Sequence, residues 1–117
     1  MEKITCSAHK SPANTLRFLE ELLAKYPGGG VILALVGMSN GLGPLLSART
    51  TWPVIGVPMR FKDRPEDVWS SLELPSLVPM MTVTSPVNAV HAALNILSMH
   101  NPALYADLQF NVEQLDV

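Results

Sequence analysis

The chain alternates between strand-like and helix-like hydrophobic patterns. Residues 31–37, VILALVG, form a continuous run of leucine and β-branched residues bounded by glycines, which predicts a strand buried on both faces. Residues 53–58, PVIGVP, predict a second such strand with prolines at its edges, and residues 81–84, MTVT, predict a third. Residues 3–7, KITCS, fit a short strand near the start of the chain.

Two longer helices are predicted from apolar residues at helical spacing and from their start signals. Ser11 suits the N-cap and Pro12 the first helical position, and the PGGG stretch at 27–30 ends that helix. Its predicted buried face consists of Leu16, Leu19, Leu22, Leu23 and Tyr26. Ser85 and Pro86 repeat the start signal. The predicted inner face of that second helix consists of Val87, Val90, Leu94 and Leu97.

Strands alternating with helices predict an α/β three-layer sandwich, in which helices cover both faces of a parallel sheet. A short helix within 39–50 and a last helix over 102–116, which we expect to dock on a neighbouring chain, complete the pattern. We find no repeat or linker, so residues 1–117 are expected to form one domain. Ligands of such sheets bind beyond the carboxyl ends of the strands, where the chain has SAHK at 7–10 and GMSNGLGP at 37–44.

Composition narrows the possible partners. Hydrophobic residues make up 48% of the chain and charged residues 15%, which predicts apolar surface that an oligomer would bury. The net charge of −2 argues against nucleic acid, and no apolar run reaches the roughly 18–20 residues that a bilayer requires. The single cysteine, Cys6, cannot form an internal disulfide, and no signal-peptide pattern is seen, so we expect a reducing, cytoplasmic location.

The SAHK turn brings together side chains suited to acid–base chemistry on an anion. His9 can accept or donate a proton near neutral pH, and Lys10 could hold a carboxylate, phosphate or carbonate. Ser7 and Ala8 are small and leave room for a ligand. The alternative is a solvated histidine beside a helix start, followed by a surface lysine.

The GMSNGLGP bend is rich in small residues but matches neither the P-loop nor the dinucleotide-binding pattern. Ser39, Asn40 and free amides at the start of the next helix could hold an anion or an amide-bearing ligand. The alternative is a tight turn that allows close packing. In DVWSSLELPS, at 67–76, we expect Trp69 to pack and the serines to serve as caps. No cysteine and histidine cluster has zinc spacing, so no metal site is predicted.

Five stretches, in their order and spacing, resemble the phosphoribosylaminoimidazole carboxylases of purine synthesis, the PurE family, and most closely its animal-type branch. They are SAHK, GMSNGLGP, TWPVIGVP, DVWSSLELPS and SPVNAVHAAL. The likeness runs from about residue 4 to about residue 100. It implies a flavodoxin-like fold, an octamer, and the joining of carbon dioxide to aminoimidazole ribonucleotide without ATP, biotin, a metal or another cofactor.

The resemblance also assigns roles to residues. It makes His9 the catalytic proton shuttle and Lys10 the residue that stabilises the carboxylate or the substrate phosphate. Together with Lys10, the substrate-binding residues that it implies are Ser7, Ala8, Gly37, Ser39, Asn40 and Gly41. Animal members of the family usually carry a fused succinocarboxamide synthetase domain, which implies a fused or associated partner of that kind.

The sequence departs from the family pattern in several places. The family has a first strand and a Gly-Ser-x-Ser-Asp loop that grips the substrate phosphate, and residues 1–6 do not resemble them. The domain is therefore expected to be incomplete at its N-terminus. Either the first two strands present pair directly, or another chain supplies the missing element, or the chain is a fragment of a longer one. Met38 stands where the animal-type branch commonly has arginine, and Glu73 and Leu77 also differ from common family residues.

Three functions follow as alternatives. The first is carboxylation of aminoimidazole ribonucleotide to carboxyaminoimidazole ribonucleotide in de novo purine biosynthesis. The second is a non-catalytic PurE-like module for oligomerisation or scaffolding, which the missing phosphate loop and Met38 favour. The third is a related carboxylase acting on a pyridinium nucleotide, whose loop also tends to carry Gly-Met, although DVWSSL and SAHK argue against it.

Overall fold

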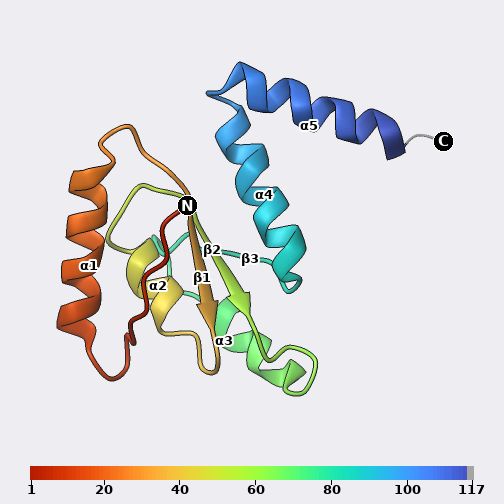
Figure 1. Cartoon of the computed structure of the whole chain (residues 1–117). Helices are drawn as coiled ribbons and strands as arrows, with labels where there is room; N and C mark the ends of the chain where they lie inside the picture. Colours follow the sequence, from red (N-terminus) through yellow and green to blue (C-terminus); the bar gives the residue numbers. More distant parts are fainter. Residues whose placement is uncertain (116–117) are drawn as a thin grey trace.

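A computed structural model describes residues 1–115 and shows a parallel sheet between helices (Figure 1). The strands are β1 (Ile32–Val36), β2 (Val54–Pro58) and β3 (Met81–Thr82), in the order β1-β2-β3. β1 pairs with β2 along its whole length, whereas only Ile55 and Gly56 of β2 pair with β3. All five residues of β2 are buried, because this strand has a neighbour on each side.

The helices of the described residues are α1 (Pro12–Lys25), α2 (Leu42–Ser47), the 3-10 helix η1 (Pro65–Val68), α3 (Trp69–Leu72), α4 (Pro86–Ser98) and α5 (Pro102–Leu115). Proline is the first residue of both α1 and α4, as predicted. Ser85 caps α4, because its hydroxyl accepts a hydrogen bond from the amide of Asn88 at 3.3 Å. Ser11 occupies the N-cap position of α1, but its side chain makes no capping bond. Residue 116 of the predicted last helix lies outside the described residues.

Two apolar clusters produce the three layers. The first joins α1 and α2 to one face of the sheet through Leu19, Ala34, Leu46 and Val54. The second joins α4 to the opposite face through Ile55, Val57, Ala89 and Ala93. Residues of β2 alternate between the clusters, as expected for a strand whose successive side chains point to opposite faces. The predicted α/β sandwich with a parallel sheet is therefore confirmed, and it is consistent with a flavodoxin-like fold.

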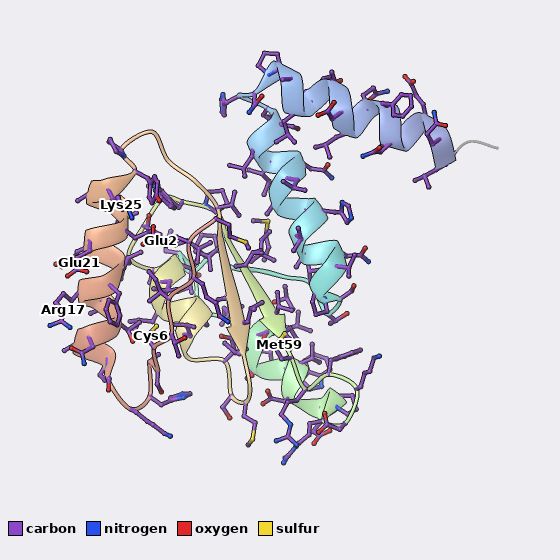
Figure 2. All side chains as sticks on the ribbon, in the orientation of Figure 1. Glu2, Cys6, Arg17, Glu21, Lys25 and Met59 are labelled. Carbon is purple, nitrogen blue, oxygen red and sulfur yellow. The ribbon has the colours of Figure 1, made fainter. Side chains whose placement is uncertain are left out.

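The strand predicted at residues 3–7 is not formed. Instead, the carboxylate of Glu2 accepts hydrogen bonds from Lys25 Nζ at 3.2 Å and from the Tyr26 hydroxyl at 2.9 Å. These bonds hold the N-terminal segment beside the end of α1 (Figure 2). Of the three alternatives, direct pairing of this segment with β1 is therefore wrong, and the outer edge of β1 has no strand partner among residues 1–115.

β1 and β3 are less buried than the apolar composition of their residues predicts. Leu35 of β1 is 54% exposed, whereas its neighbours Ala34 and Val36, which face the opposite side of the sheet, are buried. β3 covers only two residues of the predicted stretch 81–84, and Met81 is exposed. The expectation of burial on both faces is correct only for β2.

The predicted inner face of α4 is wrong. Ala89 and Ala93 contact the sheet, whereas the larger Val87, Val90 and Leu97 are exposed. This helix has apolar residues on two faces, so periodicity alone could not identify the packed one. Alanines allow the helix axis to approach the strands closely, which explains why the face with small side chains is the buried one.

Two further expectations about burial are corrected by the structure. Trp69, which we expected to pack, is 60% exposed. On α1, Leu19 is buried, Leu16, Leu22 and Leu23 are half-buried, and Tyr26 is exposed. Tyr26 follows the last helical residue, and its hydroxyl bonds to Glu2 at the surface.

The last helix, α5, projects away from the rest of the chain (Figure 1). It contacts α4, and none of its fourteen residues is buried. The radius of gyration is 15.2 Å, compared with about 13 Å for a compact chain of this length. Docking of α5 on a neighbouring chain stays a prediction.

Candidate functional site

The SAHK residues form a tight turn directly before α1. The amide of Ser11 donates to the carbonyl of Ser7 at 2.8 Å, and the amide of Lys10 donates to the Ser7 hydroxyl at 3.2 Å. His9 and Lys10 are exposed, whereas Ser7 and Ala8 are half-buried. The turn therefore offers its two basic side chains to solvent while its small residues face the protein.

The bend that follows β1 lies against this turn. A Cβ atom placed on Gly41 would lie 2.6 Å from Nε2 and 2.9 Å from Cε1 of His9, which is closer than side-chain atoms approach one another. Gly41 is therefore required for close approach of the imidazole and not for an unusual backbone angle, since its φ is −96°. The structure brings His9 and Gly41 together at the carboxyl end of the sheet, where the sequence predicted a site.

The bend is exposed at its start and buried at its centre. Gly37 and Ser39 are exposed, whereas Asn40 is only 6% exposed. The side-chain amide of Asn40 donates to the hydroxyl of the buried Ser71 at 2.9 Å, and its side-chain carbonyl accepts from the amide of Gly43 at 3.0 Å. Asn40 therefore has a structural anchoring function in this bend.

Three backbone amides of the bend and of the start of α2 are bound by side chains. The amide of Ser39 donates to Asp67 at 3.0 Å and 3.1 Å, and that of Asn40 donates to Ser70 at 2.9 Å. The amide of Gly43 bonds to Asn40, as described above. Only Gly43 of these three lies within α2, so the expectation of free helix-start amides for an anion is wrong at Gly43, and the amides of Ser39 and Asn40 before the helix are bound as well.

Sequence reasoning missed the contribution of DVWSSLELPS to this site. Asp67, Ser70 and Ser71 reach the bend from 28 to 31 residues further along the chain. Their signal was visible as polar residues in an otherwise apolar region. The sequence assigns the serines to local capping and gives Asp67 no role, because a single sequence does not show which distant segment a side chain contacts.

A cation also lies beside the bend. Arg60 follows Met59 at the end of β2 (Figure 2), and its NH1 contacts the Met38 sulfur at 3.6 Å. Its Nε and NH2 bind Asp63 at 3.1 Å and 2.7 Å. The hydrogen bond from Arg60 lowers the pKa of Asp63. Arg60 therefore places a positive charge next to Met38, where the family resemblance led us to note the absence of one.

Two hollows of the surface are lined by residues other than His9 and Gly41. One hollow, of about 760 Å³, lies around the connection from α2 to β2, and its lining includes Arg49, Trp52 and Val54. Another lies between the N-terminal segment and α1. Within residues 1–115, no group of three histidine, cysteine or acidic side chains is placed to bind a metal, and no helix is long and apolar enough to cross a membrane.

Comparison with a family model and with known proteins gives matches that agree with one another. Over residues 1–116 the chain matches the family described as AIR carboxylase. It is 42% identical over 110 residues to "Multifunctional protein ADE2" of Gallus gallus, covering 91% of this chain and 25% of that protein. It is 41% identical over 110 residues to the human "Bifunctional phosphoribosylaminoimidazole carboxylase/phosphoribosylaminoimidazole succinocarboxamide synthetase", with the same coverage.

This chain covers a larger share of a bacterial relative than of the animal proteins. The "N5-carboxyaminoimidazole ribonucleotide mutase" of Synechocystis is 32% identical over 107 residues, covering 88% of this chain and 60% of that protein. The chain spans about a quarter of the length of the animal relatives described above. Because the family match extends over nearly the whole sequence, this chain belongs to the AIR carboxylase family, whose named relatives are carboxylases and mutases.

Proposed function

We propose that this chain is a carboxylase domain of purine biosynthesis that joins carbon dioxide to the ring carbon of aminoimidazole ribonucleotide. The observation that carries the proposal is the contact between His9 and Gly41 at the carboxyl end of the sheet. Membership of the AIR carboxylase family supports the substrate class. The animal relatives support a fused or associated succinocarboxamide synthetase as partner, because their names include both activities.

The chemistry requires one new bond and the movement of one proton. The electron-rich ring carbon attacks carbon dioxide and forms a carbon–carbon bond, which leaves that ring carbon with both a hydrogen and a carboxylate. His9 then removes the proton, and the electron pair of the broken carbon–hydrogen bond restores the aromatic ring. An exposed imidazole held beside a backbone bend is suited to this step, because it can exchange the proton with solvent afterwards.

The remaining predicted residues would form the walls of this site. Ser7 and Ala8 are small, and Gly37, Ser39 and Gly41 leave the backbone of the bend accessible to a planar ring. Lys10, and the NH1 group of Arg60 whose other two nitrogens bind Asp63, would bind the new carboxylate and the substrate phosphate. Asn40 would act indirectly, since it is buried and holds the bend in place.

The non-catalytic alternative is favoured by a different part of the molecule. Val87, Val90 and Leu97 on α4, and Tyr105 and Phe110 on α5, are large apolar residues exposed on adjoining helices. Surface of this kind is usually buried by a partner. We propose that a second copy of this chain covers it within a homo-oligomer, for which the octamer implied by the family resemblance is the expected form. Such an assembly could scaffold without catalysis.

Incorporation of labelled bicarbonate into the nucleotide distinguishes the carboxylase from the non-catalytic scaffold. We expect the chain to incorporate label into aminoimidazole ribonucleotide, and His9→Asn to abolish incorporation while the assembly and its melting temperature are unchanged. Normal turnover by His9→Asn would remove this residue from the mechanism. If only N5-carboxyaminoimidazole ribonucleotide is converted, the chain is a mutase. If neither substrate is converted and neither raises the melting temperature, the scaffold function is supported.

A further inference from the structure

The bend beside His9 contains a strained residue. Ser39 has a φ of +47°, in the left-handed region that side-chain-bearing residues rarely adopt. Ser39 is also exposed, so the packing of a core does not impose this conformation. A specific interaction must therefore favour it.

Asp67 supplies that interaction. Both oxygens of its carboxylate accept the amide hydrogen of Ser39, at 3.0 Å and 3.1 Å. A hydrogen bond to a charged acceptor is stronger than one between neutral groups. In the described residues, the nearby arginines Arg60 and Arg64 form their ion pairs with Asp63 and Glu66 and not with Asp67. The carboxylate of Asp67 is therefore directed to the bend.

The neighbouring bonds fix the remainder of the bend independently. Ser70 accepts from the amide of Asn40 and donates to the carbonyl of Asp67 at 2.8 Å, and the buried Ser71 binds the side chain of Asn40. The Ser70 hydroxyl also lies 3.5 Å from Oδ1 of Asp67, but its bond to the Asp67 carbonyl is shorter and does not need the carboxylate. Loss of the carboxylate should therefore leave the bonds to Asn40 in place, and the amide of Ser39 could bond to water instead. The fold should then survive while the start of the bend relaxes.

We infer that Asp67 is a positioning residue of the proposed carboxylation site. Its carboxylate keeps Ser39 in the left-handed conformation and so presents Gly41 to the imidazole of His9. This inference rests on the proposed function for its catalytic consequence, although the geometry that it describes can be measured without substrate. Asp67 does not contact the reacting atoms in this scheme, and its effect passes through the backbone of residues 39–41.

The kinetic test compares Asp67→Ala with Asp67→Asn. We expect Asp67→Ala to lower kcat by about tenfold or more, because small misplacements of a reacting group have large effects on rate. Asp67→Asn keeps an acceptor oxygen and should retain most of the activity. Glu66→Ala is the matched control, since Glu66 lies in the same 3-10 helix but binds Arg64 and not the bend. Full activity of Asp67→Ala would overturn the inference.

A rescue experiment separates positioning from a general structural role. Glycine adopts positive φ without strain, so in Ser39→Gly the conformation of residue 39 should depend less on the Asp67 carboxylate. We therefore expect Asp67→Ala to cost several-fold less activity in the Ser39→Gly background than in the natural sequence. An equal loss in both backgrounds would contradict the inference, because the carboxylate would then act by some route other than the conformation of residue 39.

NMR of the free protein distinguishes failure of this inference from failure of the proposed function. We expect a nuclear Overhauser effect between the His9 ring and the Gly41 α-protons, which weakens in Asp67→Ala and persists in Glu66→Ala. The Ser39 amide should exchange with water faster in Asp67→Ala than in the natural sequence. If both signals change as expected in Asp67→Ala but the natural chain turns over no substrate, the proposed reaction fails and the positioning role of Asp67 stands. If neither signal changes in Asp67→Ala, the positioning role of Asp67 is overturned.

Discussion

The edge of the sheet that carries His9 and the arm formed by α4 and α5 are built in opposite ways. At the sheet edge, side chains from residues 67–71 bind the amides of the 39–43 bend, and Asn40 and Ser71 bury their polar groups against each other. In the arm, α5 has no buried residue and the larger apolar side chains of α4 face solvent.

This difference indicates which part of the molecule is complete within one chain. The backbone of the bend obtains its hydrogen-bond partners from the same chain, so its shape does not depend on another molecule. The arm exposes apolar surface that contributes nothing to stability until something covers it. A short helix with little packing is only marginally stable in water. We therefore expect the site edge to be preformed and the arm to depend on assembly.

The strongest test of a preformed site is Gly41→Ala. The added methyl group would overlap the His9 imidazole, whose Nε2 lies 2.6 Å from the Cβ position. Because His9 is exposed, the ring can move away, so we expect a loss of roughly a hundredfold in kcat/KM with little change in melting temperature. Gly28→Ala is the control, since a Cβ there meets no atom within 4 Å. Unchanged activity of Gly41→Ala would mean that the contact has no functional importance.

The second test concerns the buried polar anchor of the same edge. Ser71→Ala removes the hydroxyl that accepts the side-chain amide of Asn40, and both residues are buried. Leaving a buried donor without its partner typically costs about 1–3 kcal/mol of unfolding free energy. Urea unfolding at fixed protein concentration measures this loss, with the exposed Ser76→Ala as control. Equal stability of the two variants would show that the bend does not need this anchor.

The third test addresses the arm. Val90→Glu places a carboxylate on the exposed apolar face of α4. Burying that charge in an interface without an opposite charge or a hydrogen-bond donor is unfavourable. We expect self-association to weaken by about tenfold or more, measured by sedimentation, while the monomer stays folded. Asn95→Glu, at an exposed polar position of the same helix, should leave association unchanged. If both variants assemble like the natural chain, this face is not the interface.

Much of the fold could be predicted because local signals and tertiary packing agree for most elements. Proline at helix starts, glycines after α1 and the continuous apolar run of β2 each indicate one structure. The errors lie where the same signal permits two arrangements. Apolar residues on both faces of α4 could not be ranked by periodicity, and the short stretch at residues 3–7 had no feature that distinguished a strand from an extended segment.

The candidate site was only partly predictable for a related reason. The bend could be placed at the carboxyl edge of the sheet, because it follows the buried run of β1. His9 was placed there on the expectation of a strand at residues 3–7, which is not formed, although its imidazole does lie against the bend. The bonds from Asp67 and Ser70 could not be predicted, since they join residues 28 and 30 positions apart and carry no periodicity. Arg60 was missed likewise, because its approach to Met38 depends on how β2 ends.

The smallest expected effect belongs to the N-terminal segment, which is neither anchored like the bend nor apolar like the arm. The hydrogen bond from Tyr26, and then that from Lys25, lower the pKa of Glu2 below its ordinary value of 4.5. Their contribution to stability is therefore present above pH 4.5 and is lost as the pH falls through the depressed value. We expect Glu2→Gln to melt slightly below the natural chain at neutral pH and to match it in stronger acid. Glu20→Gln is the control. Because Glu2 lies at the surface, water weakens these bonds, and a large effect at neutral pH would mean that the segment leading to His9 is held more firmly than the bend itself.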